Sequence, residues 1–179
     1  RQHYHTERLI RESGVEFVFL RDCLYADYLP RLAGVDGVIR GPAGSGSASF
    51  VTRDDVADSA AAVLATDSYD GQVFDITGPE AITLREAAHL LSEVTGRTIS
   101  YVPETIEEAY QSRAHYGAPD WEVEGWVTSY QAIANGEMEI VSNAVETLTF
   151  HRPHTVREFL AANPASYAHF MGNGASASP

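Results

Sequence analysis

The sequence predicts an α/β fold in which a parallel sheet frames a binding crevice. Residues 15–20 are apolar except for Glu16. This run is too short for an ordinary helix and is rich in branched and aromatic side chains, which favours a strand buried on both faces of a parallel sheet. A helix predicted two residues before it gives the order of a crossover unit. Because ligands of such sheets lie beyond the carboxyl ends of the strands, we expect residues 21–26 at the rim of a crevice.

The chain opens with a predicted helix at residues 4–13, with Leu9 and Ile10 facing the core and Gly14 just past its end. A crossover unit also needs an earlier parallel strand, and none precedes this helix. The opening is therefore expected to be a cut through a larger fold.

The middle of the chain predicts short strands around one helix. Asp54 or Asp55 is expected to cap that helix, and residues 41–47 form a glycine-rich turn. The expected elements, in order, are a loop or short helix from residue 26, an extended piece at 37–40, a strand at 47–51, the helix at 56–66 and a strand at 72–77.

The second half of the chain is expected to be mostly helical. Thr83 and Glu86 form a capping box for a helix that runs to Val94 and ends at Gly96. A strand with alternating polarity follows at residues 98–102. The remaining chain predicts helices with breaks near residues 117–119, 136, 152–153 and 163–164.

Composition restricts the function. The 179 residues are 44% hydrophobic, which is enough for one domain with a core. With 25 acidic and 12 basic residues the net charge is −13, so the average field repels nucleic acid and anionic lipid. All basic residues are arginine, which excludes a Schiff-base lysine, a P-loop lysine and a Tyr-x-x-x-Lys pair within the chain. With a single cysteine and no apolar run of membrane-spanning length, we expect a cytoplasmic protein.

Short motifs follow one another in order from residue 3 to about residue 160. They lie at residues 3–7, 12–15, 20–21 with 25, 42–44, 53–57, 77–80 and 91–96. In this order they resemble the second half of an NmrA-like protein, an atypical member of the extended short-chain dehydrogenase/reductase superfamily.

The resemblance implies the C-terminal portion of an NAD(P)-binding Rossmann-like fold with a mostly helical substrate or lid region. Residues 1–170 would form a single incomplete domain, with the end of the sheet at 1–80, the lid region at 81–170 and a disordered tail at 171–179. No Gly-rich turn after a strand matches a dinucleotide fingerprint, and the turn at 41–46 is more easily explained as a plain turn. The NADP or NAD would therefore be held mainly by the missing N-terminal half.

The resemblance also assigns site residues. Counting back from Glu7 puts His3 at the family's catalytic lysine, so His3 is expected to contact the nicotinamide ribose or to orient substrate; a terminal histidine in solvent is the alternative. Residues 23–26, which are Cys23, Leu24, Tyr25 and Ala26, would line the nicotinamide end of the cofactor.

The predicted substrate pocket contains Asp22, Tyr25 and Trp126. Trp126 belongs to an aromatic set with Trp121 and Tyr130 that indicates either core packing or a substrate-side wall. Inert packing of Cys23 is favoured over a redox sensor, because Asp22 disfavours the thiolate.

One pair of aspartates and one pair of histidines could suggest a catalytic or metal site, but a structural interpretation is simpler for each. Adjacent Asp54 and Asp55 at a helix start indicate a cap and a dipole partner. His151 and His154 have the spacing of metal ligands but lack a third ligand, so no metal site is predicted.

The resemblance implies an NAD(P)H-dependent oxidoreductase that passes a hydride to a quinone-like acceptor. A non-catalytic NADP(H)-sensing regulator of the same family that signals through a partner protein, and an inactive truncated fragment, stay open. The choice between NADH and NADPH also stays open. An exposed sheet edge would favour self-association.

Overall fold

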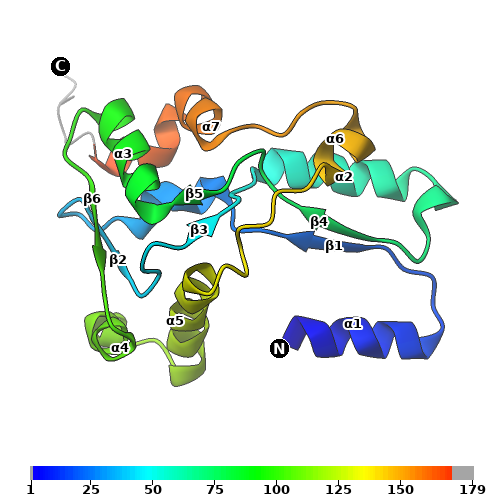
Figure 1. Ribbon diagram of the computed structural model, residues 1–179, viewed down its shortest axis with the longest axis horizontal. Coiled ribbons are helices and arrows are strands. Elements are labelled where there is room, and N and C mark those ends of the chain that lie inside the picture. The colour runs from blue at the N-terminus through cyan, green and yellow to red at the C-terminus, as the bar shows by residue number, and fades with distance from the viewer. Residues whose placement is uncertain (1, 171–179) are drawn as a thin grey trace, which may run out of the picture.

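The computed structural model describes residues 2–170, and it shows parallel strand pairs with helices packed around them (Figure 1). β1 (Phe19–Asp22) pairs in parallel with β4 (Val73–Ile76). β2 (Val38–Gly41) pairs in parallel with β6 (Ser100–Pro103), and β3 (Ser47–Ala48) pairs antiparallel with β5 (Ile82–Thr83). The predicted α/β fold with parallel strands is confirmed.

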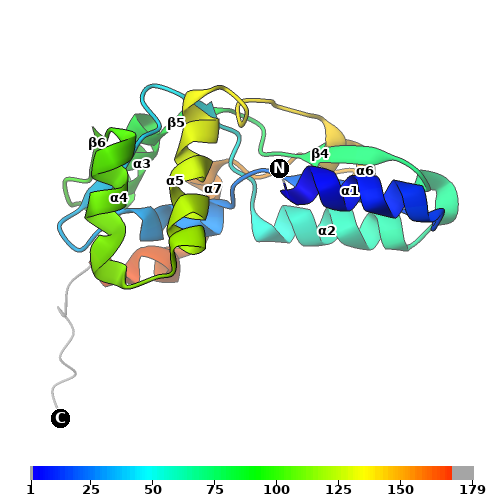
Figure 2. The same cartoon turned by 90° about the horizontal axis from the view of Figure 1, so that it is seen from below.

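Helices cover both sides of the β1–β4 pair. Figures 1 and 2 show α1 and α2 on opposite sides of these strands, with α6 beside α2. The helices are α1 (Gln2–Ser13), α2 (Arg53–Leu64), α3 (Leu84–Thr95), α4 (Ile106–Arg113), α5 (Asp120–Ala134), α6 (Ala144–Thr149) and α7 (Val156–Ala162). Three 3₁₀ helices lie between them, η1 (Ala26–Leu32), η2 (Asp67–Tyr69) and η3 (Ala114–Tyr116), and η4 (Pro164–Phe170) follows α7.

The apolar side chains of the described residues form a larger core, a smaller core and a small cluster between α4 and α5. The larger core joins η1 to α3, α7 and η4, and Leu29, Leu91 and Leu160 are fully buried in it. The smaller core lies between α2, α6 and β4 and includes Ile76 and Val145. Burial of such side chains stabilises the fold by roughly 1.5–3 kcal/mol each.

A threonine begins each of four helices. Thr83, Thr105 and Thr155 form complete capping boxes with the glutamate three residues later, and Thr52 accepts a hydrogen bond from the backbone of Asp55. The predicted box at Thr83 is confirmed, as is the end of that helix at Gly96, whose φ is 65°. The predicted cap of α2 was wrong: Thr52 caps the helix, because the Asp55 carboxylate is buried and makes other bonds.

The central strand differs from its prediction. β1 begins at Phe19 and continues to Asp22, and its side chains are half-buried or exposed instead of buried on both faces. The reason is that α1 covers it with charged groups: Arg21 forms a bidentate pair with Glu7 at 2.8 and 2.7 Å. Arg11 lies over the ring of Phe19 at 5.0 Å. The prediction that Leu9 faces the core was also wrong, since this residue is 60% exposed.

The remaining elements lie close to their predicted positions. The strand expected at 47–51 is shortened to β3, and Val51 forms only an isolated parallel bridge with Tyr25. In the helical half, Gly117 and Gly136 have φ of 63° and 75° and mark the expected breaks. The expected tail, residues 171–179, lies wholly outside the described residues.

Candidate functional site

A cavity of about 1100 Å³ opens where β1 ends, between η1, β2, α4 and α5. Its position agrees with the rule that ligands of parallel sheets lie beyond the carboxyl ends of the strands. Residues from distant parts of the chain line it: Cys23, Leu24, Tyr25, Tyr28, Leu29, Arg31, Leu32, Gly34, Val38, Arg40, Phe50, Ser112, Arg113, His115, Tyr116, Trp126, Ser129, Tyr130 and Ile133. We call this space the β1-end cavity.

Aromatic rings dominate the walls of the β1-end cavity. Tyr25 and Tyr28 stack with their centroids 6.4 Å apart, and Tyr116 meets Trp126 edge-to-face at 5.8 Å. Such rings bury flat apolar surface and keep polar groups at their edges. The cavity is therefore suited to a planar conjugated ligand.

Backbone hydrogen bonds fix the segment from Cys23 to Ala26. The Cys23 amide donates to the Ile76 carbonyl at 2.9 Å, and Leu24 and Ala26 exchange bonds with Val51 at 3.0 and 2.9 Å. Cys23, Leu24 and Tyr25 thereby face the cavity, whereas Ala26 is fully buried outside its lining. The predicted cofactor residues 23–25 are thus brought together on one rigid wall.

The Cys23 thiol is poorly suited to redox chemistry. Burial raises its pKa, and the sulfur contacts the Met138 carbonyl at 3.7 Å. A raised pKa lowers the thiolate fraction, and the thiolate is the reactive form. Packing is therefore the role that the geometry favours; the prediction had attributed the effect to Asp22, but burial is the main cause.

Asp22 lies at the end of β1, where its carboxylate binds the hydroxyl of Tyr25. The Tyr25 hydroxyl donates a 2.8 Å hydrogen bond to the Asp22 carboxylate, and this bond is the largest cause of the raised pKa of Tyr25. Asp22 is exposed and does not itself line the cavity. It acts on the cavity through the orientation of the Tyr25 ring.

The other predicted residues divide between the cavity and the surface. Trp126 and Tyr130 line the cavity, whereas Trp121 is 73% exposed. His3 lies exposed on α1 and is not part of the cavity lining. The roles assigned to His3, Cys23, Tyr25 and Trp126 stay predictions.

Arg113 is a site residue that sequence reasoning missed. Its side chain is buried and donates to Glu104 at 2.9 Å and to the Arg40 carbonyl at 2.9 Å. The guanidinium also lies 5.2 Å from the centroid of the Tyr130 ring. It fixes the back wall where α4, α5 and β2 meet, and only the fold brings these partners together.

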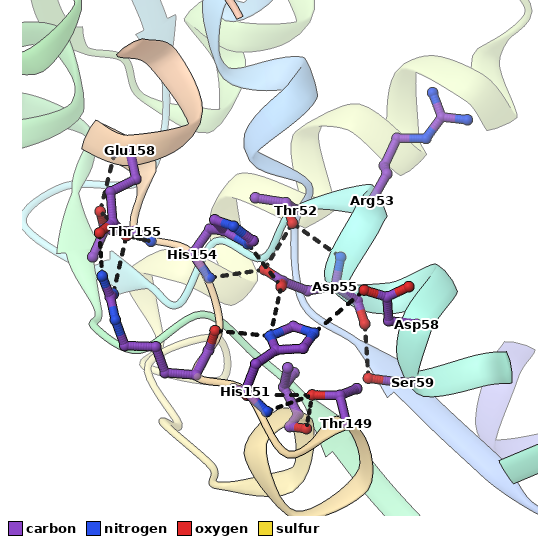
Figure 3. Close-up of polar contacts among 12 residues, drawn as sticks. Thr52, Arg53, Asp55, Asp58, Ser59, Thr149, His151, His154, Thr155 and Glu158 are labelled. Carbon is purple, nitrogen blue, oxygen red and sulfur yellow. Dashed lines mark hydrogen bonds and ion pairs between the residues drawn. The ribbon is translucent and has the colours of Figure 1, made fainter. Parts of the chain in front are cut away.

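A second polar cluster joins the start of α2 to the segment before α7 (Figure 3). The buried Asp55 carboxylate accepts hydrogen bonds from the backbone and the ring Nδ1 of His154, both at 2.9 Å, and from the Thr52 hydroxyl at 2.7 Å. The neighbouring His151 ring faces Asp58 at 3.3 Å. Across residues 2–170 no group of three or more His, Cys, Asp or Glu side chains is arranged to hold a metal ion.

Within the described part of the chain, no helix has the length and apolar character needed to cross a membrane.

Comparisons with known proteins agree with this geometry. The chain is 26% identical over 164 residues to an NAD(P)H azoreductase of Xenophilus azovorans, covering 90% of this chain and 57% of that protein. It is 28% identical over 162 residues to quinone oxidoreductase 2 of Escherichia coli (strain K12), covering 88% and 56%. No protein-family model matches the chain.

Solved structures give the same relationship. The crystal structure of the Escherichia coli NADPH-dependent quinone oxidoreductase QOR2 complexed with NADPH superposes with a TM-score of 0.82 at 27% identity, covering 89% of this chain and 58% of that one. The chain thus spans little more than half of the length of its relatives. Its predicted resemblance to the C-terminal half of an NmrA-like short-chain dehydrogenase/reductase is confirmed.

Proposed function

We propose that the protein passes a hydride from NADPH or NADH to a quinone-like acceptor held in the β1-end cavity. The observation that carries this proposal is the aromatic cavity at the carboxyl end of β1, formed by a part of the fold shared with quinone and azo reductases. A nicotinamide ring needs apolar walls that are fixed by backbone bonds, and residues 23–25 meet that need.

The residues of this chain supply position and desolvation. When bound, the cofactor would supply the hydride, and this hydride together with one proton would complete the two-electron reduction of a quinone to a hydroquinone, leaving NAD(P)⁺. Trp126 and Tyr116 would hold the acceptor ring, and η1 would exclude water from it. Tyr25 is held by Asp22 and its pKa is raised, so we assign it to orientation; the proton would come from water or from His115.

The pyrophosphate of the cofactor has no evident place in this chain. The sequence contains no Gly-rich turn that follows a strand and opens a helix, which is the arrangement that binds a dinucleotide phosphate. We therefore propose that residues outside this chain hold most of the cofactor. His3 is proposed to approach the nicotinamide ribose in that complete site.

The activity is tested by steady consumption of NADPH and of NADH with a panel of quinones, using the protein with its upstream sequence. Turnover supports the oxidoreductase, and Trp126→Ala should then raise KM for the quinone by about tenfold because a wall of the cavity is lost. His3→Gln should lower kcat if the histidine contacts the cofactor. Tight binding of NADPH without its consumption would contradict the proposed enzyme activity and would favour a non-catalytic NADP(H) sensor.

A further inference from the structure

The charged groups of the β1-end cavity differ in sign from the rest of the chain. Acidic residues outnumber basic ones by 25 to 12 in the sequence. The lining of the cavity nevertheless includes Arg31, Arg40, Arg113 and His115 and no aspartate or glutamate. A cavity walled by aromatic rings alone would need no cations for a neutral quinone, so the arginines need an explanation.

Two of these arginines are already neutralised. Arg113 donates to Glu104 at 2.9 Å, and Arg40 donates to Asp36 at 2.8 Å. The charge of each is therefore already balanced by a carboxylate before a ligand enters.

Arg31 is different, because within residues 2–170 it forms no ion pair and no hydrogen bond through its side chain. It lies exposed on η1, with its guanidinium 5.9 Å from the centroid of the Tyr28 ring, and both residues line the cavity. A guanidinium beside an aromatic face keeps its charge, and its N–H donors stay free for another partner. The cavity therefore presents a free cation next to a flat apolar wall.

We propose that Arg31 selects acceptors that carry an anionic substituent, such as a carboxylate, sulfonate or phosphate, on a planar conjugated ring. This inference rests on the proposed function, and it names the class of acceptor. The ring would lie between the aromatic walls, and the oxyanion would accept two parallel hydrogen bonds from Arg31. The net charge of −13 disfavours anions elsewhere on the chain, so the preference depends on this one side chain.

The test is calorimetric binding to this 179-residue chain of two matched ligands, an anthraquinone monosulfonate and the neutral hydroxymethyl anthraquinone. We expect the sulfonate to bind about tenfold more tightly, which corresponds to one charge-assisted contact. Arg31→Gln should abolish that preference, whereas Arg31→Lys should retain part of it because the charge remains. Added salt should weaken binding of the sulfonate and leave the neutral ligand unaffected.

Arg8→Gln is the matched control, since Arg8 is exposed on α1, outside the cavity lining, and pairs only loosely with Glu12 at 3.6 Å. It should leave the preference unchanged. Circular dichroism of each variant shows whether the fold is kept. Equal affinity for the two ligands, a preference that survives Arg31→Gln, or no binding of either ligand would each overturn the inference.

A phosphate of the cofactor is the other source of an oxyanion for Arg31. Titration of NADPH into the protein with its upstream sequence, with and without Arg31→Gln, separates the two sources: a loss of NADPH affinity with an unchanged acceptor preference overturns the inference. Failure of the proposed function looks different. Sulfonate binding through Arg31 without NADPH consumption would contradict the proposed reductase activity. Turnover of neutral quinones that does not depend on Arg31 would contradict only the proposed acceptor preference.

Discussion

At the scale of a single residue, Asp55 connects two segments that are distant in the sequence. Its buried carboxylate faces only donors: the Thr52 hydroxyl, the His154 amide and the His154 ring. It thereby ties the first turn of α2 to the segment that begins α7. Loss of this carboxylate would leave the donors buried without a partner. The free-energy penalty for those unpaired donors is larger than the net contribution of the hydrogen bonds to stability.

Asp55→Ala should therefore lower the free energy of unfolding by about 2–4 kcal/mol. Asp55→Asn should cost less, because the His154 ring can present a bare Nδ1 to the new amide. The matched control is Asp54→Ala, on the same turn but exposed. Urea unfolding of the four proteins gives the values, and an equal effect at both positions would contradict the role of Asp55.

His151 makes the stability of the same cluster depend on pH. Its Nδ1 donates to the Arg152 carbonyl at 3.0 Å and its Nε2 faces Asp58 at 3.3 Å, so both ring nitrogens face acceptors. The Arg152 carbonyl, followed by Asp58 and Asp55, raises its pKa above the ordinary value of 6.5. A raised pKa in the folded state means that the charged ring stabilises the fold below pH 6.5 and that this contribution is lost as the pH rises through the raised pKa.

His151→Gln should thus destabilise the protein below pH 6.5 by less than about 1 kcal/mol, since the ring is partly exposed, and should have little effect at alkaline pH. Unfolding curves of both proteins across this range measure the difference. His5→Gln is the matched control, because it removes an exposed histidine of α1 that lies outside this cluster. A difference that grows with rising pH would have the wrong sign.

Among elements, the local signals could be predicted and the long-range ones could not. Thr83, Glu86 and Gly96 mark the ends of α3 within its own sequence, and the structure agrees. The same threonine pattern begins α4 and α7, so those starts were open to prediction as well. The burial of β1 depends on what covers it, and no local pattern says that Arg21 pairs with Glu7 of α1.

The site shows the same division. The end of an apolar strand indicated where Cys23, Leu24 and Tyr25 would lie, because that signal is local. Arg113 and Arg31 join the same cavity only because α4 and η1 fold against β2 and β1. The sequence pattern of a single arginine does not contain that information.

The packing of α5 against the glycine-rich turn is a further property of an element. A Cβ at Gly46 would lie 2.1 Å from the Ile133 carbonyl oxygen, so this glycine lets the backbone of the turn contact α5 directly. Ile133 also lines the β1-end cavity. The position of one cavity wall therefore depends on the absence of a side chain at residue 46.

Gly46→Ala should destabilise the protein by about 1–3 kcal/mol, because backbone atoms must move to relieve the overlap. Gly125→Ala is the matched control within α5: a Cβ there meets nothing within 4 Å, and alanine should stabilise the helix by about 0.5–1 kcal/mol. Thermal unfolding measures both. The same sign for the two changes would show that the close approach at residue 46 is unimportant.

At the scale of the whole molecule, two electrostatic effects oppose each other. The net charge of −13 repels itself in the folded state, whereas surface pairs such as Arg21–Glu7 and Arg40–Asp36 attract. Exposed pairs contribute about 0–1 kcal/mol each and are screened by salt as well. The repulsion acts between many charges at once, so we expect it to be the larger effect at low ionic strength.

Added sodium chloride should accordingly raise the free energy of unfolding as the ionic strength rises to about 0.2 M, where the Debye length falls below about 8 Å. Screening also weakens the repulsion between chains. Self-association through an exposed sheet edge, which the sequence led us to expect, would therefore be strongest at high salt. Light scattering at each salt concentration therefore accompanies the unfolding curves: a rise in stability with an unchanged monomer mass assigns the effect to the single chain. Stability that falls with salt would mean that the ion pairs outweigh the net charge.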